Sequence, residues 1–344
     1  MRAWLIGSLL AALANGAAQA ADFSTLRGEI ADAAPSAAQP SPFTVGVRYW
    51  YSTGRHDYSF NGSIGTVLIG GTIYRLGNPT SELTYADIPA HTGEVFGRYT
   101  DAETGLVIKG YVGGGGFADG GTMNDRDWVE GQRLFSNTNS SLKASNLRYL
   151  TLDIGWGADY LTFGNLQFLP FLGYGHWHDG VGTWGLTQLP DDFGGAAYGT
   201  PAGTVFFTNN QKVGGYVASW HMVRLGAEGT LSITPQLTIT VDGAFVPYAQ
   251  GNGDDSHLLR QDELGSKPNV FLRGHGWGGQ VDALVHYQVT NNFSVGIGGR
   301  YWYIDASSGY KTDRIDNLFG GPRLPLTTFT TERYGLLAEA AYKF

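Results

Sequence analysis

A period-two alternation of apolar and polar residues runs from residue 43 to the end of the chain and constrains its fold more than any other feature. In residues 149–160, "YLTLDIGWGADY", one face of an extended chain carries Leu150, Leu152, Ile154, Trp156, Ala158 and Tyr160. The opposite face carries polar or very small residues, apart from Tyr149. The segment therefore predicts a β-strand with one apolar face, and residues 281–289 and 293–303 repeat the pattern.

Alternation alone fits a soluble β-sandwich as well as a membrane barrel. Three further features favour the barrel. Aromatic residues gather at the ends of the predicted strands, as in the last residues Tyr342-Lys343-Phe344, and short and long connections alternate along the chain. The polar face carries glycine and charge rather than side chains that would pack a core. No segment after the N-terminal region is long and apolar enough for a spanning helix.

The pattern predicts ten strands, at residues 43–54, 81–99, 104–115, 146–161, 165–178, 213–233, 236–248, 273–289, 292–305 and 331–344. Long loops are predicted at residues 55–80, 116–145, 179–212, 249–272 and 306–330, with tight turns between the other strands. The predicted fold is all-β, a ten-stranded antiparallel transmembrane β-barrel of the Gram-negative outer membrane, with long extracellular loops and short periplasmic turns. Such a barrel is narrow and filled by side chains, because an aqueous channel takes about 16 strands. A porin conflicts with this count, and we expect function at the outer loops.

The N-terminal region reads as an export signal. Residues 1–20 combine Arg2, an apolar run at residues 3–14 and the small-x-small end Ala18-Gln19-Ala20, and the run is too short for a membrane anchor. Residues 21–42 are rich in alanine, serine and proline and are predicted to be a flexible periplasmic leader to a barrel at residues 43–344. The net charge of −8 argues against a nucleic-acid partner.

Two polar pairs in the predicted outer loops are candidates for chemistry. Asp125 and Asp127 follow the third predicted strand, and Asp255 and His257 follow the seventh. Members of each pair are two residues apart, so they point the same way in extended chain. The two strands lie nearly opposite in a ring of ten, which predicts that the pairs face each other across the mouth. The alternative is that both pairs are merely solvated.

This arrangement resembles the omptin family of outer-membrane proteases. The stretch "GTMNDRDW" is similar to the family's Gly-Asn-Met-x-Asp-x-Asp-Trp segment, and Asp255-Ser256-His257 to its Asp-x-His. The segments "SELTYA" at residues 81–86, "GYVASWHM" at residues 215–222 and the terminal "AYKF" also resemble omptin strands, so the likeness extends over most of the mature chain.

The resemblance implies an endopeptidase that uses water as its nucleophile. Asp125 and Asp127 would hold the water, and Met123 beside them is expected to bind substrate. His257 would take the proton from the water near neutral pH, and Asp255 would orient the imidazole. The implied partners are peptides or proteins at the cell surface and outer-membrane lipid. No cofactor is implied, except lipopolysaccharide as an activator.

The sequence departs from the family pattern at two sites. Omptins bind a basic side chain in an acidic pocket, whose acids would fall here at Asp57 and at Gly253, which has no carboxylate. The adjacent Asp254 would point the opposite way. We therefore expect a looser preference for arginine or lysine.

The second departure concerns lipid. The family's lipopolysaccharide clamp, Tyr-x-Glu-x-Arg, reads here as Tyr174-Gly175-His176-Trp177-His178. Tyr174, His176 and His178 are therefore expected to form a weak lipid site. The two histidines are not predicted to bind a metal, because no third ligand lies nearby in sequence. The alternative function is a non-catalytic barrel: an adhesin, or a structural or lipid-binding surface protein.

Overall fold

The structure is a computed structural model. It describes residues 42–344 except residues 70, 117–118, 158–160, 191, 193–199 and 315–320. The predicted signal peptide and almost all of the predicted leader lie outside the described residues.

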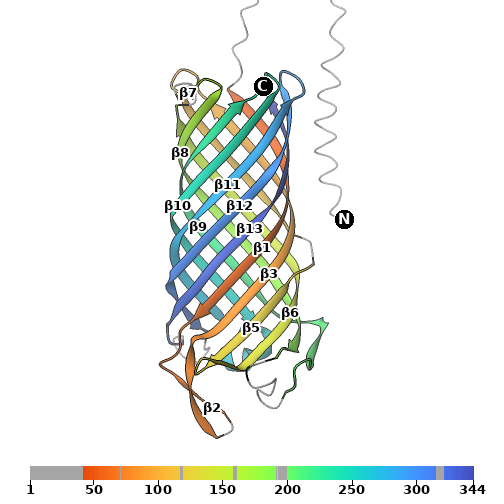
Figure 1. The fold of residues 1–344 in the computed structure, drawn as a ribbon, viewed down its shortest axis with the longest axis vertical. Coiled ribbons are helices and arrows are strands. Elements are labelled where there is room, and N and C mark those ends of the chain that lie inside the picture. Colours follow the sequence, from red (N-terminus) through yellow and green to blue (C-terminus); the bar gives the residue numbers. More distant parts are fainter. Residues whose placement is uncertain are drawn as a thin grey trace, which may run out of the picture. The chain divides into compact units, whose positions relative to one another are not determined.

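Long antiparallel strands form a closed, tilted barrel (Figure 1). In ring order they are β1 (Phe43–Phe60), β3 (Thr72–Thr100), β4 (Leu106–Gly116), β6 (Gln132–Trp156), β8 (Leu166–Gln188), β9 (Val205–Ser232), β10 (Leu237–His257), β11 (Val270–Gln288), β12 (Phe293–Asp313) and β13 (Leu324–Lys343). Each pairs with the next, and β13 pairs with β1, which closes the ring. The predicted all-β antiparallel barrel is confirmed, and each predicted range overlaps one of these strands.

Shorter elements lie at the two ends of the barrel. At the end that carries the long connections, β2 (Thr66–Ile69) pairs with β3, and β5 (Thr122–Val129) pairs with β3 and β6. The same end holds the 3₁₀-helix η2 (Leu258–Arg260) and α2 (Gln261–Leu264). The short β7 (Thr162–Phe163) lies at the opposite end with the C-terminus (Figure 1).

The strands extend farther at the outer end than the sequence predicts. The predicted loop at residues 116–145 instead contains β5 and the first half of β6. Asp125 and Asp127 therefore lie on a strand and not in a loop, because β5 forms a ladder with β3 that runs from Ser81–Asp127 to Ala86–Thr122. In the same way, Asp255 and His257 belong to the last three residues of β10. Strand pairing fixes both polar pairs in the wall of the barrel.

The outer face of the barrel is apolar, and the alternation decides which residues lie there. On β13, Leu336 is 65 % exposed whereas the next residue, Leu337, is 1 % exposed. Other strands expose residues such as Val95, Ile154 and Ile297 in the same way. Such an apolar band is what a membrane barrel presents to lipid. No helix within the described ranges is long and apolar enough to cross a membrane.

The interior of the barrel is filled by side chains. Trp302 packs against Trp50, Tyr149 and Trp177, with ring centroids 5.0 to 5.3 Å apart. Beside this cluster, Arg300 bonds to Glu94 at 2.7 Å and to Asp282 at 2.6 Å. A charge buried in this way requires such partners. The filled interior agrees with the expectation that function lies at the outer mouth.

Candidate functional site

A pocket of about 300 Å³ opens at the outer end of the barrel. Both predicted polar pairs line it, together with Met123 from β5. The other lining residues are Thr138, Thr183, Leu186, Val213, Gly214, Ser256, Leu259 and Arg260. The structure therefore brings together two pairs of residues that lie about 130 positions apart in the sequence. The catalytic roles of these four residues stay predictions.

Strand β5 aims both aspartates at the pocket. Asp125 pairs with Leu83 of β3, and Asp127 pairs with Ser81. Leu83 is buried, so the residues that alternate in phase with it face the interior. The Ser81 hydroxyl donates to Asp125 Oδ1 at 3.5 Å, a long hydrogen bond. Two carboxylates are thus held on one strand and on one face, so that each bears on the charge of the other.

This environment disfavours a doubly charged pair. Removal from water and the neighbouring Asp127 raise the pKa of Asp125 well above its ordinary value. Removal from water also raises the pKa of Asp127, against the opposing effects of Ser81 and Arg260. Two carboxyls in one site titrate as a coupled unit, so we expect them to share a proton. A shared proton leaves one acceptor and one donor to hold a water molecule.

Asp255 is held by three hydrogen-bond donors. The hydroxyls of Tyr58 and Tyr85 donate to its Oδ2 at 2.5 and 2.8 Å, and the Ser256 amide donates to its Oδ1 at 2.6 Å. His257 Nε2 lies 3.6 Å from the same Oδ2. With three donors fixing its position, Asp255 can in turn orient the imidazole.

The backbone of His257 is held separately by Asn269, which is fully buried. The Asn269 side chain accepts from the His257 amide at 2.9 Å and donates to the His257 carbonyl at 3.1 Å. Sequence reasoning did not single out Asn269, because a lone asparagine in a predicted loop has no distinctive pattern.

Three tyrosines form a wall that sequence reasoning also missed. Tyr216 stacks on Tyr85 and Tyr58, with ring centroids 4.8 and 5.6 Å apart. Burial and the nearby Asp255 raise the pKa of Tyr58 and Tyr85 well above its usual value, so both hydroxyls stay protonated donors. The signal was present in the alternation, which puts Tyr58 on the same face as the buried Trp50.

Asp57, which the family pattern assigns to an acidic pocket, does not line this pocket. Asp57 lies on the outward phase of β1, between the buried His56 and Tyr58. Its carboxylate bonds to Arg55 at 2.6 Å and to Thr84 at 2.7 Å. Asp57 faces away from the interior because successive side chains of a strand point to opposite faces, so that a shift of one residue moves a side chain to the other face.

The other expected acid is also missing from the pocket. Gly253 has no side chain, and Asp254 pairs with Arg273 at 2.9 Å. Neither residue lines the pocket, whereas Met123 does.

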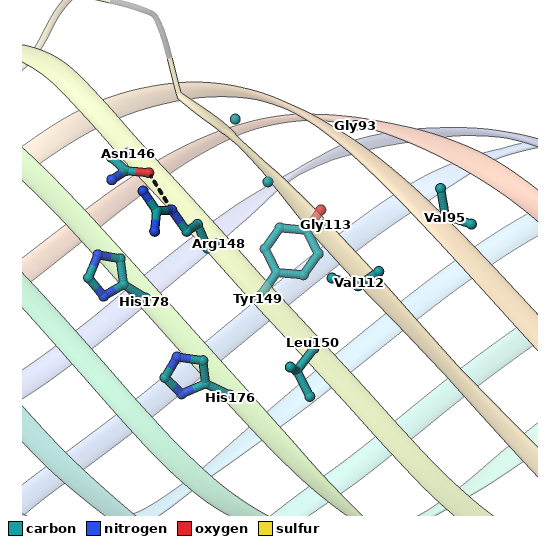
Figure 2. Close-up of a pocket in the computed structure, with 12 residues that line it drawn as sticks. Gly93, Val95, Val112, Gly113, Asn146, Arg148, Tyr149, Leu150, His176 and His178 are labelled. Atoms are coloured by element: carbon teal, nitrogen blue, oxygen red, sulfur yellow. Dashed lines mark hydrogen bonds between the residues drawn. The ribbon is translucent and has the colours of Figure 1, made fainter. Parts of the chain in front are cut away.

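The predicted lipid residues lie on the outer surface of β8, apart from this pocket. Figure 2 shows His176 and His178 with Arg148 of β6 at a hollow of about 750 Å³, which Gly93 and Gly113 also line. Arg148 donates to Asn146 at 3.2 Å. Tyr174 does not line the hollow and bonds to His221 at 2.6 Å. Within the described part of the chain, no three His, Cys, Asp or Glu side chains are grouped to hold a metal ion.

Comparisons with known proteins bear on the fold. Neither a family model nor a curated protein matches the sequence. Among solved structures, the outer membrane protease OmpT from Escherichia coli aligns with 89% of this chain and 98% of its own, with a TM-score of 0.63 and 14% identity. The chain has the fold of an outer-membrane β-barrel. The outer membrane protein OprG from Pseudomonas aeruginosa aligns with 87% of this chain and 96% of its own, at a TM-score of 0.35 and 10% identity. Identity this low carries the likeness no further than the fold.

Proposed function

We propose that this outer-membrane barrel is an omptin-like endopeptidase that hydrolyses peptide bonds at its extracellular mouth. One observation supports the proposal above the others. Asp125, Asp127, Asp255 and His257 come from two strands that are remote in the sequence, and they line one pocket. The solvated alternative predicts four separate surface side chains.

In the proposed mechanism, a water molecule lies between the two pairs. His257 accepts a proton from this water as its oxygen attacks the carbonyl carbon of the peptide. The imidazolium then gives the proton to the leaving amine, and the carbon–nitrogen bond breaks. Asp255 keeps the ring oriented and stabilises its charge, as the aspartate does in a Ser-His-Asp triad. No bond forms between enzyme and substrate, so no acyl-enzyme accumulates.

We further propose that the hollow beside Arg148, His176 and His178 is where outer-membrane lipid phosphate binds, with lipopolysaccharide as a possible activator. The supporting observation is a fixed cation flanked by two imidazoles on the lipid-facing side of the wall. Binding should strengthen as the pH falls and the imidazoles become charged. Lipopolysaccharide affinity that stays the same between pH 5 and pH 8 would argue against this site.

The acidic pocket of the family pattern is incomplete, because Gly253 has no carboxylate and Asp57 does not line the pocket. This favours a second candidate, a non-catalytic adhesin, structural protein or lipid-binding protein of the same fold. Peptide digestion distinguishes the two candidates. The purified barrel, supplied with lipopolysaccharide, should cleave members of a peptide library, and His257→Ala should not. A barrel that folds but cleaves no peptide would leave the non-catalytic candidate.

A further inference from the structure

We infer that the pocket accepts an aliphatic side chain, rather than a basic one, next to the bond that is cut. This inference rests on the proposed function and names its substrate class. It depends on an apolar wall inside the pocket and on two features of the barrel wall near Asp255: a face that has no room for a carboxylate, and a cation already buried behind that face.

The face near Gly253 has no room for an acid. A Cβ atom added at Gly253 would lie 2.7 Å from Leu272 Cδ1 and 3.0 Å from the Tyr216 hydroxyl. Both neighbours are fully buried, so neither can move away easily. The tyrosine wall therefore occupies the space that a carboxylate would need to meet a substrate's ammonium or guanidinium group.

Behind the tyrosine wall, the chain supplies a basic side chain of its own. His56 packs edge-on against Tyr216, with ring centroids 5.4 Å apart, and lies 3.5 Å from Asp179. Arg333 is fully buried and bonds to the same carboxylate at 2.8 Å. Asp179 is thus already paired with Arg333. A substrate guanidinium placed on this side of the tyrosine wall would lie near the charge of Arg333, without an unpaired carboxylate to neutralise it. Burying an unpaired charge in this way is costly.

The strands between the two polar pairs form the apolar wall. Around the barrel from β5 to β10, β8 and β9 contribute Leu186 and Val213, and η2 adds Leu259; Thr138 of β6 and Thr183 of β8 also lie along this side. A peptide that reaches from the aspartate pair to His257 must lie along this wall. Arg260 also lines the pocket with Asp125 and Asp127, and it already supplies a positive charge to both carboxylates. Contact with this wall stabilises a bound aliphatic side chain, because apolar surface can be buried without a hydrogen-bond or charge partner.

Two series of matched peptides test the inference on the full-length protein in detergent with lipopolysaccharide. Each series varies one residue, on either side of the cut, among leucine, alanine, arginine and glutamate. In one of the series, kcat/KM for leucine should exceed that for alanine and for arginine by about tenfold to a few hundredfold, the range that an apolar pocket can discriminate.

A charge placed on the wall should reverse this preference. Leu259 is 39 % exposed, so Leu259→Asp should leave the fold intact while it adds an acid to the pocket. We expect the leucine peptide to lose, and the arginine peptide to gain, about tenfold in kcat/KM. Val213→Ala should lower kcat/KM for the leucine peptide without raising it for the arginine peptide. Ile64→Asp is the matched control, since Ile64 is 92 % exposed and does not line the pocket.

The outcomes separate this inference from the proposed function. Cleavage that favours arginine, or that ignores Leu259→Asp, would overturn the aliphatic preference and leave the endopeptidase intact. If no peptide is cleaved, the proposed function fails. The same peptides then remain whole, and their binding to the wild-type barrel can be measured. Equal binding of the leucine and arginine peptides would overturn the inference as well.

Discussion

The paired aspartates are the residues with the least favourable surroundings in the site. In the folded protein, their pKa values lie above those of the unfolded chain, so the protonated form is the one that folding favours. Their stabilising effect is complete below the unfolded pKa and is lost as pH rises through the folded pKa. At higher pH, a second negative charge in this site opposes folding. We interpret this cost as one that catalysis requires.

Asp125→Asn should therefore change activity and stability in opposite directions. Loss of the carboxylate should lower kcat by about 10²–10⁴, the usual effect of a positioned acid–base group. The same change removes the charge repulsion, so the unfolding temperature at neutral pH should rise. Asp254→Asn, on a carboxylate that pairs with Arg273 and does not line the pocket, is the control. An Asp125→Asn barrel that unfolds at a lower temperature would contradict the predicted repulsion.

Arg260 should set the upper pH limit of activity. Its positive charge lowers the pKa of both aspartates, against the larger effect of their removal from water. If the active pair holds one proton, activity declines as pH rises through the pKa at which that proton is lost. Arg260→Gln removes the cation, raises that pKa and should move the alkaline limb of the kcat/KM profile to higher pH. Arg55→Gln, outside the pocket, should leave it in place. A limb that stays fixed or moves to lower pH in Arg260→Gln would contradict a proton shared by the pair.

At the scale of elements, β5 decides whether the site forms, and a glycine decides how β5 begins. Gly121 has a φ of 87°, in the region that favours glycine. A Cβ atom there would collide with the carbonyl oxygens of Ala86 and Asp87 on β3. The first residue of "GTMNDRDW" is thus a requirement of strand pairing, as well as part of a motif that resembles a family.

Gly121→Ala should displace β5 and reduce activity. Backbone strain of this kind costs about 1–3 kcal/mol, and the collision with β3 adds to it. Gly131→Ala is a matched control, because Gly131 also has a positive φ, of 81°, but has no atom within 4 Å of the added Cβ. Thermal unfolding and peptide cleavage, measured on both variants, separate strain from displacement. Equal loss of activity in the two would show that the contact with β3 is unimportant.

The two-residue alternation of apolar and polar side chains explains which strands could be predicted from the sequence and which could not. It identified the membrane-facing parts of the strands, because lipid on one side forces strict alternation there. It missed β5, whose charged residues lack that contrast and become a strand through pairing with β3. Alternation from Trp50 puts Asp57 on the outward face of β1, away from the pocket that the resemblance implied for it. Alternation puts Tyr58 on the inward face, but the stacking of the three tyrosines depends on contacts between β1, β3 and β9, which are remote in the sequence.

At the scale of the whole molecule, the filled interior confines the chemistry to one end. Aromatic rings and the charge network of Arg300, Glu94 and Asp282 occupy the middle of the barrel. Removing one member of such a buried network leaves its partners as unpaired buried charges and typically lowers stability by about 3–5 kcal/mol. The wall above the membrane is therefore built on a rigid base, which suits a site whose two halves must stay a fixed distance apart across the mouth.

Digestion of a peptide library by the wild-type barrel and by His257→Ala, with lipopolysaccharide present, is the decisive test of the proposed endopeptidase. The proposed mechanism predicts that the wild type cleaves, and that serine inhibitors, cysteine inhibitors and chelators have no effect, since the nucleophile is water without an acyl-enzyme or a metal. It predicts that His257→Ala lowers the rate by about 10²–10⁴ and remains folded. Cleavage by His257→Ala at close to the wild-type rate, or a folded wild type that cleaves nothing, would contradict this mechanism.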